Sequence, residues 1–161
     1  MARFQTVRRR ARFVVHGFSQ DAMLRIAEPT RESIRARIQD RGETVYDAPA
    51  RPLKAKYAKM KNNYTRKYGS PKAKQIRNWT LTGHTMDCMR VIWVAVNRAS
   101  ISFLAAVNSL RPAKLKLPAS VIAHIQNMRE RQFGLSPRDK QVLAGAVHKE
   151  ARRFVKAEKV A

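Results

Sequence analysis

The sequence predicts a small α+β domain in which two main helices pack on a small antiparallel sheet, with a long basic loop. Three observations lead to this prediction. Apolar residues recur at helical spacing between Met23 and Ile38. Two β-rich runs, at 91–96 and 100–107, flank a short connection at 97–99 and predict a hairpin over about 90–107. A strong helix start at 136–139 precedes a second amphipathic stretch.

Residues 1–18 are predicted to form a basic N-terminal arm. Residues 19–161 are predicted to form a single domain, since 161 residues is the usual size of one. The arm holds five arginines and no acidic residue. Phe13 and Val14 interrupt the arginines, so the alternative is an extended segment that docks on a neighbour. The arginines of this arm that we expect to contact DNA or an acidic partner are Arg8, Arg9, Arg10 and Arg12.

The first helix is predicted to begin after Ser19, whose side chain suits the N-cap position, with Asp21 in the first turn. Pro29 interrupts the apolar pattern, which predicts either a kink or a restart capped by Thr30. The helix should end at Gly42, because glycine readily adopts the left-handed conformation that closes a helix.

A long basic loop is predicted over 48–80, with a short helix over 53–62. No acidic residue occurs from Ala48 to Met86, and tyrosines are interleaved with the cations. The cations suit phosphates, and the aromatic rings suit either unpaired bases or anchoring of the loop on the domain; we favour anchoring for the tyrosines. The candidate contacts in this loop are Lys54, Lys56, Lys59, Lys61, Arg66, Lys67, Lys72, Lys74 and Arg77.

The second half of the chain contains the hairpin and the last helix. A short helix is predicted over 82–89, and residues 108–118 read as a loop or as an edge strand protected by lysines. At the last helix, Ser136 is the expected N-cap, Pro137 the first helical residue and Asp139 the third. The apolar pattern then continues to about Lys156.

The charge balance indicates an anionic partner. The formal net charge is +23, which repels itself in a compact state unless something negative offsets it. Nucleic acid is the commonest such partner, an acidic protein surface the second and anionic lipid the third. No apolar run is long enough to span a membrane, and the lone Cys88 excludes an internal disulfide and fits synthesis in a reducing cytoplasm.

The sequence contains no motif that indicates catalysis or a cofactor. The four histidines are far apart and have no cysteine or carboxylate at metal-ligand spacing. No phosphate-binding glycine loop, nucleophile elbow or zinc-protease pattern occurs. We therefore expect a protein that is not an enzyme and that binds no cofactor or metal.

Three segments together resemble the phage virion-morphogenesis family, the tail-completion and neck proteins of the head-to-tail junction. They are IRARIQDRGETVYDAPARPLKAKYAKMK (34–61), WTLTGHTMDCMRVIWVAV (79–96) and AHIQNMRERQFGLSPRDKQVL (123–143). In the second segment Gly83 permits a tight turn before the short helix, and Thr82 can cap that helix. In the third, Phe133 and Leu135 read as apolar anchors around a turn at Gly134.

The resemblance implies a structural protein of the virion, made in the host cytoplasm. It implies a homo-oligomeric ring (a hexamer or a dodecamer) that docks other connector, portal or tail proteins around the DNA channel. Contact with DNA would be non-specific, and no membrane is involved. The alternative hypothesis is a basic nucleic-acid-binding module, either ribosome-associated or a DNA-packaging protein, whose affinity would fall steeply with salt.

Overall fold

The computed structural model describes residues 11–14, 17–67, 76–79, 84–106 and 117–158. Within these ranges the chain forms five α-helices, one π-helical turn and a three-stranded antiparallel sheet, which confirms the predicted α+β class. In chain order the elements are β1 (Ala11–Val14), α1 (Gln20–Ala36), η1 (Arg37–Arg41), α2 (Ala55–Lys67), α3 (His84–Asp87), β2 (Met89–Ala95), β3 (Arg98–Phe103), α4 (Ala119–Arg129) and α5 (Pro137–Glu158).

Helix α1 begins where the sequence predicts. The Oγ of Ser19 accepts a hydrogen bond from the Ala22 N–H at 3.3 Å. The helix runs through Pro29 without a restart, so of the two alternatives predicted there, the restart capped by Thr30 is wrong. Pro29 lies on the exposed side, and the Thr30 hydroxyl donates to the Ile26 carbonyl at 3.0 Å instead of capping a new helix.

The end of α1 widens into the π-helical turn η1 before the chain leaves the helix at Gly42. Gly42 has φ of 65°, the left-handed conformation predicted for the helix end. The carbonyl of Arg37 accepts a hydrogen bond from the Glu43 N–H at 3.1 Å. From this wide turn the Arg37 side chain reaches the loop that precedes α5, where it contacts the carbonyls of Gln132 and Gly134.

The predicted hairpin is present as β2 and β3. Ala95 pairs with Arg98, so the turn is formed by Val96 and Asn97 and the predicted connection at 97–99 is wrong: Arg98 and Ala99 already belong to β3. Asn97 has a φ of 62°, which suits a two-residue turn. The second strand ends at Phe103, whereas the sequence predicts strand to 107. The Asn97 side chain accepts a hydrogen bond from the Phe18 N–H at 3.0 Å, which ties the start of α1 to the hairpin turn.

The N-terminal arm predicted over 1–18 is wrong for residues 11–14. They form β1, which pairs antiparallel with β3 and places Arg12 opposite Ser100. The physical reason is that β3 offers a second edge of unpaired N–H and C=O groups, and the run Phe13–Val14 favours strand. The sheet order is therefore β1-β3-β2. Arg8, Arg9 and Arg10 lie outside the described residues.

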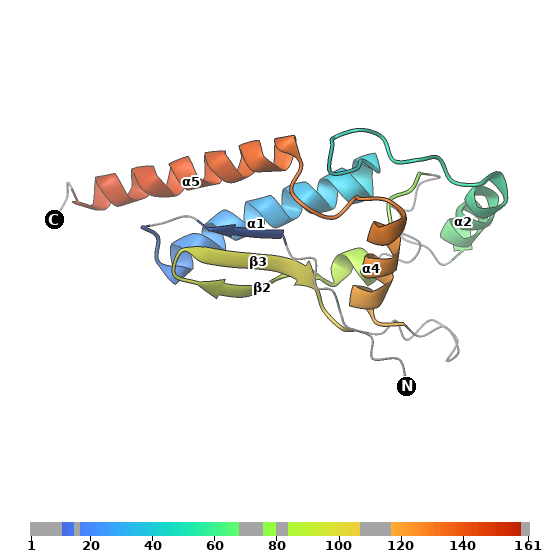
Figure 1. Cartoon of the computed structure of the whole chain (residues 1–161), viewed down its shortest axis with the longest axis horizontal. Helices are drawn as coiled ribbons and strands as arrows, with labels where there is room; N and C mark the ends of the chain where they lie inside the picture. Colours follow the sequence, from blue (N-terminus) through green and yellow to red (C-terminus); the bar gives the residue numbers. More distant parts are fainter. Residues whose placement is uncertain (1–10, 15–16, 68–75, 80–83, 107–116, 159–161) are drawn as a thin grey trace.

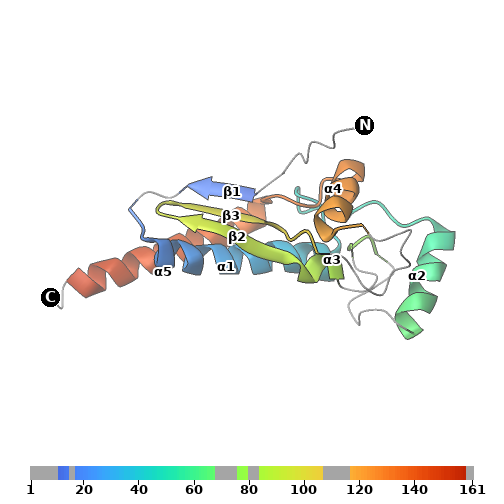
Figure 2. The ribbon, with the colours of Figure 1, turned by 90° about the horizontal axis from the view of Figure 1, so that it is seen from below.

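The two main helices and the sheet stack on one another (Figures 1 and 2). Helix α1 packs against β2 and β3, and α5 packs along α1. Side chains from α1 and the sheet form the fully buried centre of the core, including Met23, Ile26, Ile34, Met89 and Ile101. Helix α2 stands at the end of the molecule opposite the C-terminal end of α5 (Figure 1).

The predicted long loop over 48–80 is interrupted by a regular helix. Helix α2 spans Ala55–Lys67, five residues beyond the expected end of a short helix over 53–62. The 13 residues of α2 include no glycine or proline, which lets the helix continue. Helix α4, which the sequence did not predict, follows Pro118 and buries Ala119, Ala123 and Asn127.

A buried arginine joins the end of α1 to the start of α5. The Nε of Arg37 donates to Oδ2 of Asp139 at 2.9 Å, and both side chains are fully buried. The terminal nitrogens of the guanidinium donate to three backbone carbonyls: those of Gln132 and Gly134, in the loop before α5, at 2.8 Å each, and that of Glu43 at 3.2 Å. The other carboxylate oxygen of Asp139 accepts from the Ser33 hydroxyl at 2.6 Å. The buried charges are thus paired and hydrogen-bonded, as burial requires.

The predicted start of α5 is confirmed by a reciprocal cap. The Asp139 N–H donates to the Ser136 Oγ, and the Ser136 N–H donates to the Asp139 carboxylate, both at 3.1 Å. This is the capping-box arrangement, with aspartate in the position of the usual glutamate. Asp139 therefore serves the helix cap and the Arg37 ion pair at once.

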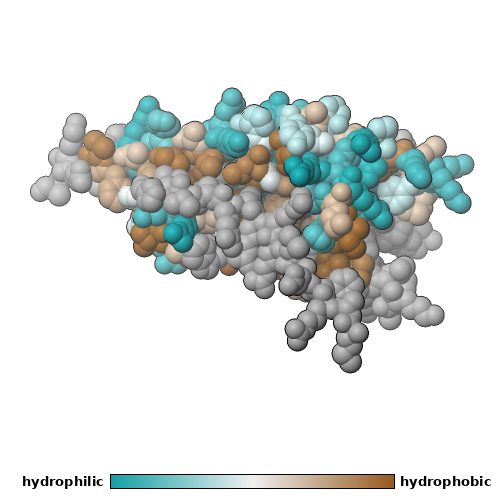
Figure 3. All heavy atoms as spheres, viewed as in Figure 1, coloured by the Kyte–Doolittle hydropathy of each residue, from teal (hydrophilic) through white to brown (hydrophobic). Residues whose placement is uncertain are grey.

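Every ion pair that the described residues form with one another is made by an arginine. Arginine suits this role because its planar fork matches a carboxylate. Within the same part of the chain, the exposed lysines Lys54, Lys56 and Lys59 form no ion pair. Hydrophilic side chains are prominent at the α2 end in the view of Figure 3, with hydrophobic ones among them. The arginines in ion pairs are Arg25, Arg31, Arg35, Arg37, Arg41, Arg77, Arg138 and Arg153.

Candidate functional site

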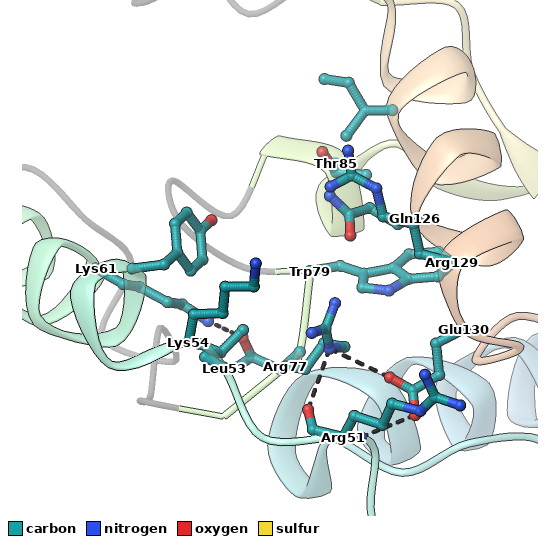
Figure 4. A pocket seen from close by; sticks show the side chains of 13 residues that line it. Arg51, Leu53, Lys54, Lys61, Arg77, Trp79, Thr85, Gln126, Arg129 and Glu130 are labelled. Carbon is teal, nitrogen blue, oxygen red and sulfur yellow. Dashed lines mark hydrogen bonds and ion pairs between the residues drawn. The ribbon is translucent and has the colours of Figure 1, made fainter.

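A groove of about 660 Å³ lies between α2 and α4 (Figure 4). Three chain segments form it: the approach to α2 and its first turns, the stretch 77–79, and one side of α4 with the residue that follows it, with Thr85 of α3 beside them. Its volume is within the range of about 300–1,000 Å³ that is usual for ligand pockets. The lining residues are Arg51, Leu53, Lys54, Tyr57, Lys61, Arg77, Asn78, Trp79, Thr85, Ile122, Gln126, Arg129 and Glu130.

Lys61 holds α2 in place beside the groove. Its side chain is buried, and its Nζ donates to the Ile76 carbonyl at 2.8 Å and to Oδ1 of Asn78. Asn78 in turn donates from Nδ2 to the Gln39 carbonyl in η1 at 2.9 Å. Burial lowers the pKa of Lys61 from 10.5 to about 8. Lys61 thus anchors the helix, which differs from the expected role as a surface contact.

Glu130, at the end of α4, is the single carboxylate among the described residues that line the groove. Its Oε2 lies 3.2 Å from Nε of Arg77, and its Oε1 accepts from the Arg51 N–H at 2.8 Å. Arg77 also donates to the Arg51 carbonyl at 3.1 Å. These contacts link the approach to α2 with the end of α4, and they balance the charge of Glu130 with that of Arg77.

Three further cations of the groove remain unbalanced. The side chains of Arg51, Lys54 and Arg129 are exposed and form no ion pair within the described part of the chain. Arg51 and Lys54 come from the segment before α2, and Arg129 ends α4. Lys54 and Arg129 lie on opposite sides of Trp79 in Figure 4. The groove therefore carries a net positive charge.

Trp79 links the groove to the hydrophobic core. Its ring centroid lies 5.9 Å from that of Phe103, which packs 5.0 Å from Phe133. The backbone of Trp79 has φ of 53°, a left-handed conformation that costs free energy in a residue with a bulky side chain. Its indole Nε1–H is buried, and no hydrogen-bond acceptor for it is found in the described part of the chain. Two unfavourable features thus coincide at one residue of the groove, as happens at binding sites.

The structure brings together only some of the cations that the sequence indicated. Lys54, Lys61 and Arg77 line the groove, whereas Lys56 and Lys59 are exposed on α2 outside it. Arg66 and Lys67 belong to the last turn of α2. Lys72, Lys74, Thr82 and Gly83 lie outside the described residues.

Two groove residues, Arg51 and Arg129, were not among the predicted contacts. Arg51 stands in the acid-free stretch and could have been included on that ground. Nothing in the sequence pointed to Arg129, because helix α4 was not predicted. The buried residues of α4 are small or polar, so the helix shows no clear apolar period.

The predicted anchors of the closing segment lie where the chain enters α5. Phe133 is part of the core, and its N–H donates to the Asn127 side chain at 2.9 Å. Leu135 packs against the core from outside it. Gly134 has a φ of 143°, and its carbonyl accepts from Arg37. A Cβ at Gly134 would lie 3.2 Å from the Val45 side chain.

Other chemical groups in the described residues do not form a site. No group of three or more histidines, cysteines and carboxylates there is placed to hold a metal ion. Cys88 is buried, and burial raises the pKa of its thiol; its Sγ lies 3.6 Å from Nε2 of His84. None of the helices in the described ranges has the length and apolar character needed to cross a membrane.

No protein-family model, curated protein or solved structure matches the chain.

Proposed function

We propose that the protein is a structural subunit of a phage head-to-tail junction, a neck or tail-completion protein without catalytic activity. Subunits assemble as a homo-oligomeric ring, a hexamer or a dodecamer, that docks the connector to the tail around the DNA channel. The observation that carries the proposal is that the three segments resembling that family, although far apart in the sequence, pack into one structural unit.

The first and third segments are joined through buried hydrogen bonds. Arg37, in segment 34–61, binds the Gln132 and Gly134 carbonyls and Asp139, all in segment 123–143. The Val45 N–H also donates to the Arg131 carbonyl at 2.9 Å. These contacts fix the loop after α1 against the entry to α5.

The second segment, 79–96, contributes α3 and β2 to the same unit. Strand β2 packs against α1, and α3 packs against α4. Trp79 reaches Phe133 of the third segment through Phe103. The three segments thus lie in contact within one structural unit, as the segments of a shared fold would. This supports the family resemblance as the basis of the proposal.

The proposal places the protein in the virion, after synthesis in the host cytoplasm. Its partners would be copies of itself and portal, connector or tail subunits. The unbalanced cations described above would face DNA or an acidic neighbour, through charge rather than sequence reading.

The direct test is assembly. The purified chain is analysed by light scattering after size-exclusion chromatography and by negative-stain microscopy, alone and mixed with portal and connector proteins of a tailed phage. Rings, formed alone or on the connector, support the proposal. Monomers under all of these conditions contradict it.

A further inference from the structure

We propose that the groove between α2 and α4 binds single-stranded nucleic acid, with phosphates at Arg51, Lys54 and Arg129 and an unpaired base on Trp79. This function goes beyond the proposed junction role and does not rest on it. A ring can form whether or not the groove is occupied, and the groove can bind in a monomer.

The first step is the charge of the groove. Glu130, the one carboxylate among its described lining residues, is already held by Arg77 and by the Arg51 N–H. The positive charges of Arg51, Lys54 and Arg129 therefore have no anionic partner in the described part of the chain. Exposed cations that converge on a groove from separate elements attract phosphates and release the counterions that surround a nucleic acid.

The second step is the aromatic side chains that lie among these cations. Trp79 lines the groove, and Lys54 and Arg129 lie on either side of it in Figure 4. Tyr57, on the first turn of α2, also lines the groove and is 43% exposed. Aromatic rings within a basic groove are the arrangement by which proteins hold single strands, since every base can stack on them.

The third step is the recessed position of Trp79. A paired base in a duplex is stacked between its neighbours and presents only its edges, so its face cannot reach this ring. An acidic peptide could satisfy the cations, but its carboxylates would not use the aromatic surface. The combination of cations and ring therefore favours an unpaired nucleotide over a duplex and over an acidic peptide.

The first experiment reads Trp79 directly. The chain has two tryptophans, so Trp93→Phe leaves Trp79 as the sole indole fluorophore. The full-length variant is titrated with an oligothymidylate of about ten nucleotides, with a duplex of the same length and with polyglutamate. We expect saturable quenching of Trp79 by the single strand only. Equal quenching by the duplex or by polyglutamate, or binding without any quenching, overturns the proposal.

The second experiment tests the cations with a matched control. Lys54→Gln/Arg129→Gln removes two exposed groove charges, and Lys56→Gln/Lys59→Gln removes two exposed charges of α2 outside the groove. Binding of a fluorescein-labelled oligothymidylate is followed by anisotropy across a salt series. We expect the groove variant to lower the slope of log affinity against log salt by about two, and the control by less than about one.

The two variants have the same net charge, so a general effect of charge would weaken binding equally in both. Equal losses overturn the proposal, as does full affinity in the groove variant. Thermal unfolding by circular dichroism verifies that both variants fold, which the exposure of all four side chains leads us to expect. Because ring formation is measured separately by light scattering, failure here leaves the junction proposal unaffected.

Discussion

The Nε of Arg37 lies 2.9 Å from Oδ2 of Asp139, and neither side chain has any exposed surface. The two residues are 102 positions apart in the chain. One ends the first main helix and the other caps the last, so the pair fixes the angle at which α5 meets α1. The guanidinium also donates to the carbonyls of Gln132 and Gly134, in the loop before α5, and to that of Glu43.

Replacing Arg37 with methionine should lower the free energy of unfolding by about 3–5 kcal/mol, because Asp139 is left charged, buried and without its partner. Urea unfolding at neutral pH measures this change. The control is Arg35→Met, which breaks the ion pair to Asp87, whose side chain is 58% exposed, and should cost less than about 1 kcal/mol. Equal losses in the two variants would mean that the buried pair contributes no more than a surface contact.

The burial of Lys61 should make the stability rise at alkaline pH. The folded chain releases the Lys61 proton near pH 8, whereas the unfolded chain keeps it to about 10.5. Between these values the unfolded state binds more protons, so the free energy of unfolding increases with pH. Lys61→Met has no proton to lose, and the stability difference between wild type and this variant should widen in favour of wild type across this window.

The control for that measurement is Lys61→Arg, whose guanidinium stays protonated throughout the same range. Like the methionine variant, it should not show the increase in the free energy of unfolding with pH that Lys61 causes. Denaturant unfolding at intervals between neutral and alkaline pH gives both comparisons. A constant difference between wild type and each variant would show that Lys61 keeps its proton in the fold.

Two glycines should respond to alanine with opposite signs. At Gly42 the left-handed φ of 65° and a Cβ only 2.9 Å from the Ile76 side chain should cost about 1–3 kcal/mol. At Gly145, in the exposed part of α5, nothing lies within 4 Å of a Cβ, and alanine should stabilise the helix by about 0.5–1 kcal/mol. Midpoints of thermal unfolding should shift in opposite directions, and a gain at Gly42 would contradict the close approach of Ile76.

The junction proposal predicts that ring assembly and DNA binding depend on different residues. Replacing Arg66, Lys67, Lys72 and Lys74 with glutamine should leave ring formation intact, because the described contacts that join the first and third motif segments are made by Arg37 and Val45. Affinity for duplex DNA should fall, with a salt slope reduced by up to about four. Light scattering and filter binding measure the two properties, and loss of the ring itself would place these cations in a subunit contact.

The parts of the fold that the sequence predicted correctly depend on short-range interactions. Ser19 and Ser136 bind N–H groups three residues further on, and Asn97 makes its turn from its own backbone conformation. Residues close in sequence carry such information. The α+β class followed because these local signals sit in the order helix, hairpin, helix.

The features of the fold that the sequence did not reveal depend on contacts between residues far apart in the chain. Nothing within its neighbourhood marks Arg37 as buried rather than one more surface cation, since Asp139 selects it only in the fold. Strand β1 exists because β3 offers it an edge. The groove needs Lys54 from one helix approach and Arg129 from an unpredicted helix, so the sequence indicated the charge but not where it would converge.

Because the carboxylates pair with arginines, the exposed lysines form a second group of cations with different chemistry. The exposed lysines Lys54, Lys56 and Lys59 carry charge that no described carboxylate holds in place. Amine-selective acetylation could therefore neutralise them while the guanidinium contacts of the fold stay intact. The same holds for evolutionary change. Lysines on α2 can be gained or lost one at a time, which changes the attraction for a polyanion in small steps and leaves the fold unaltered.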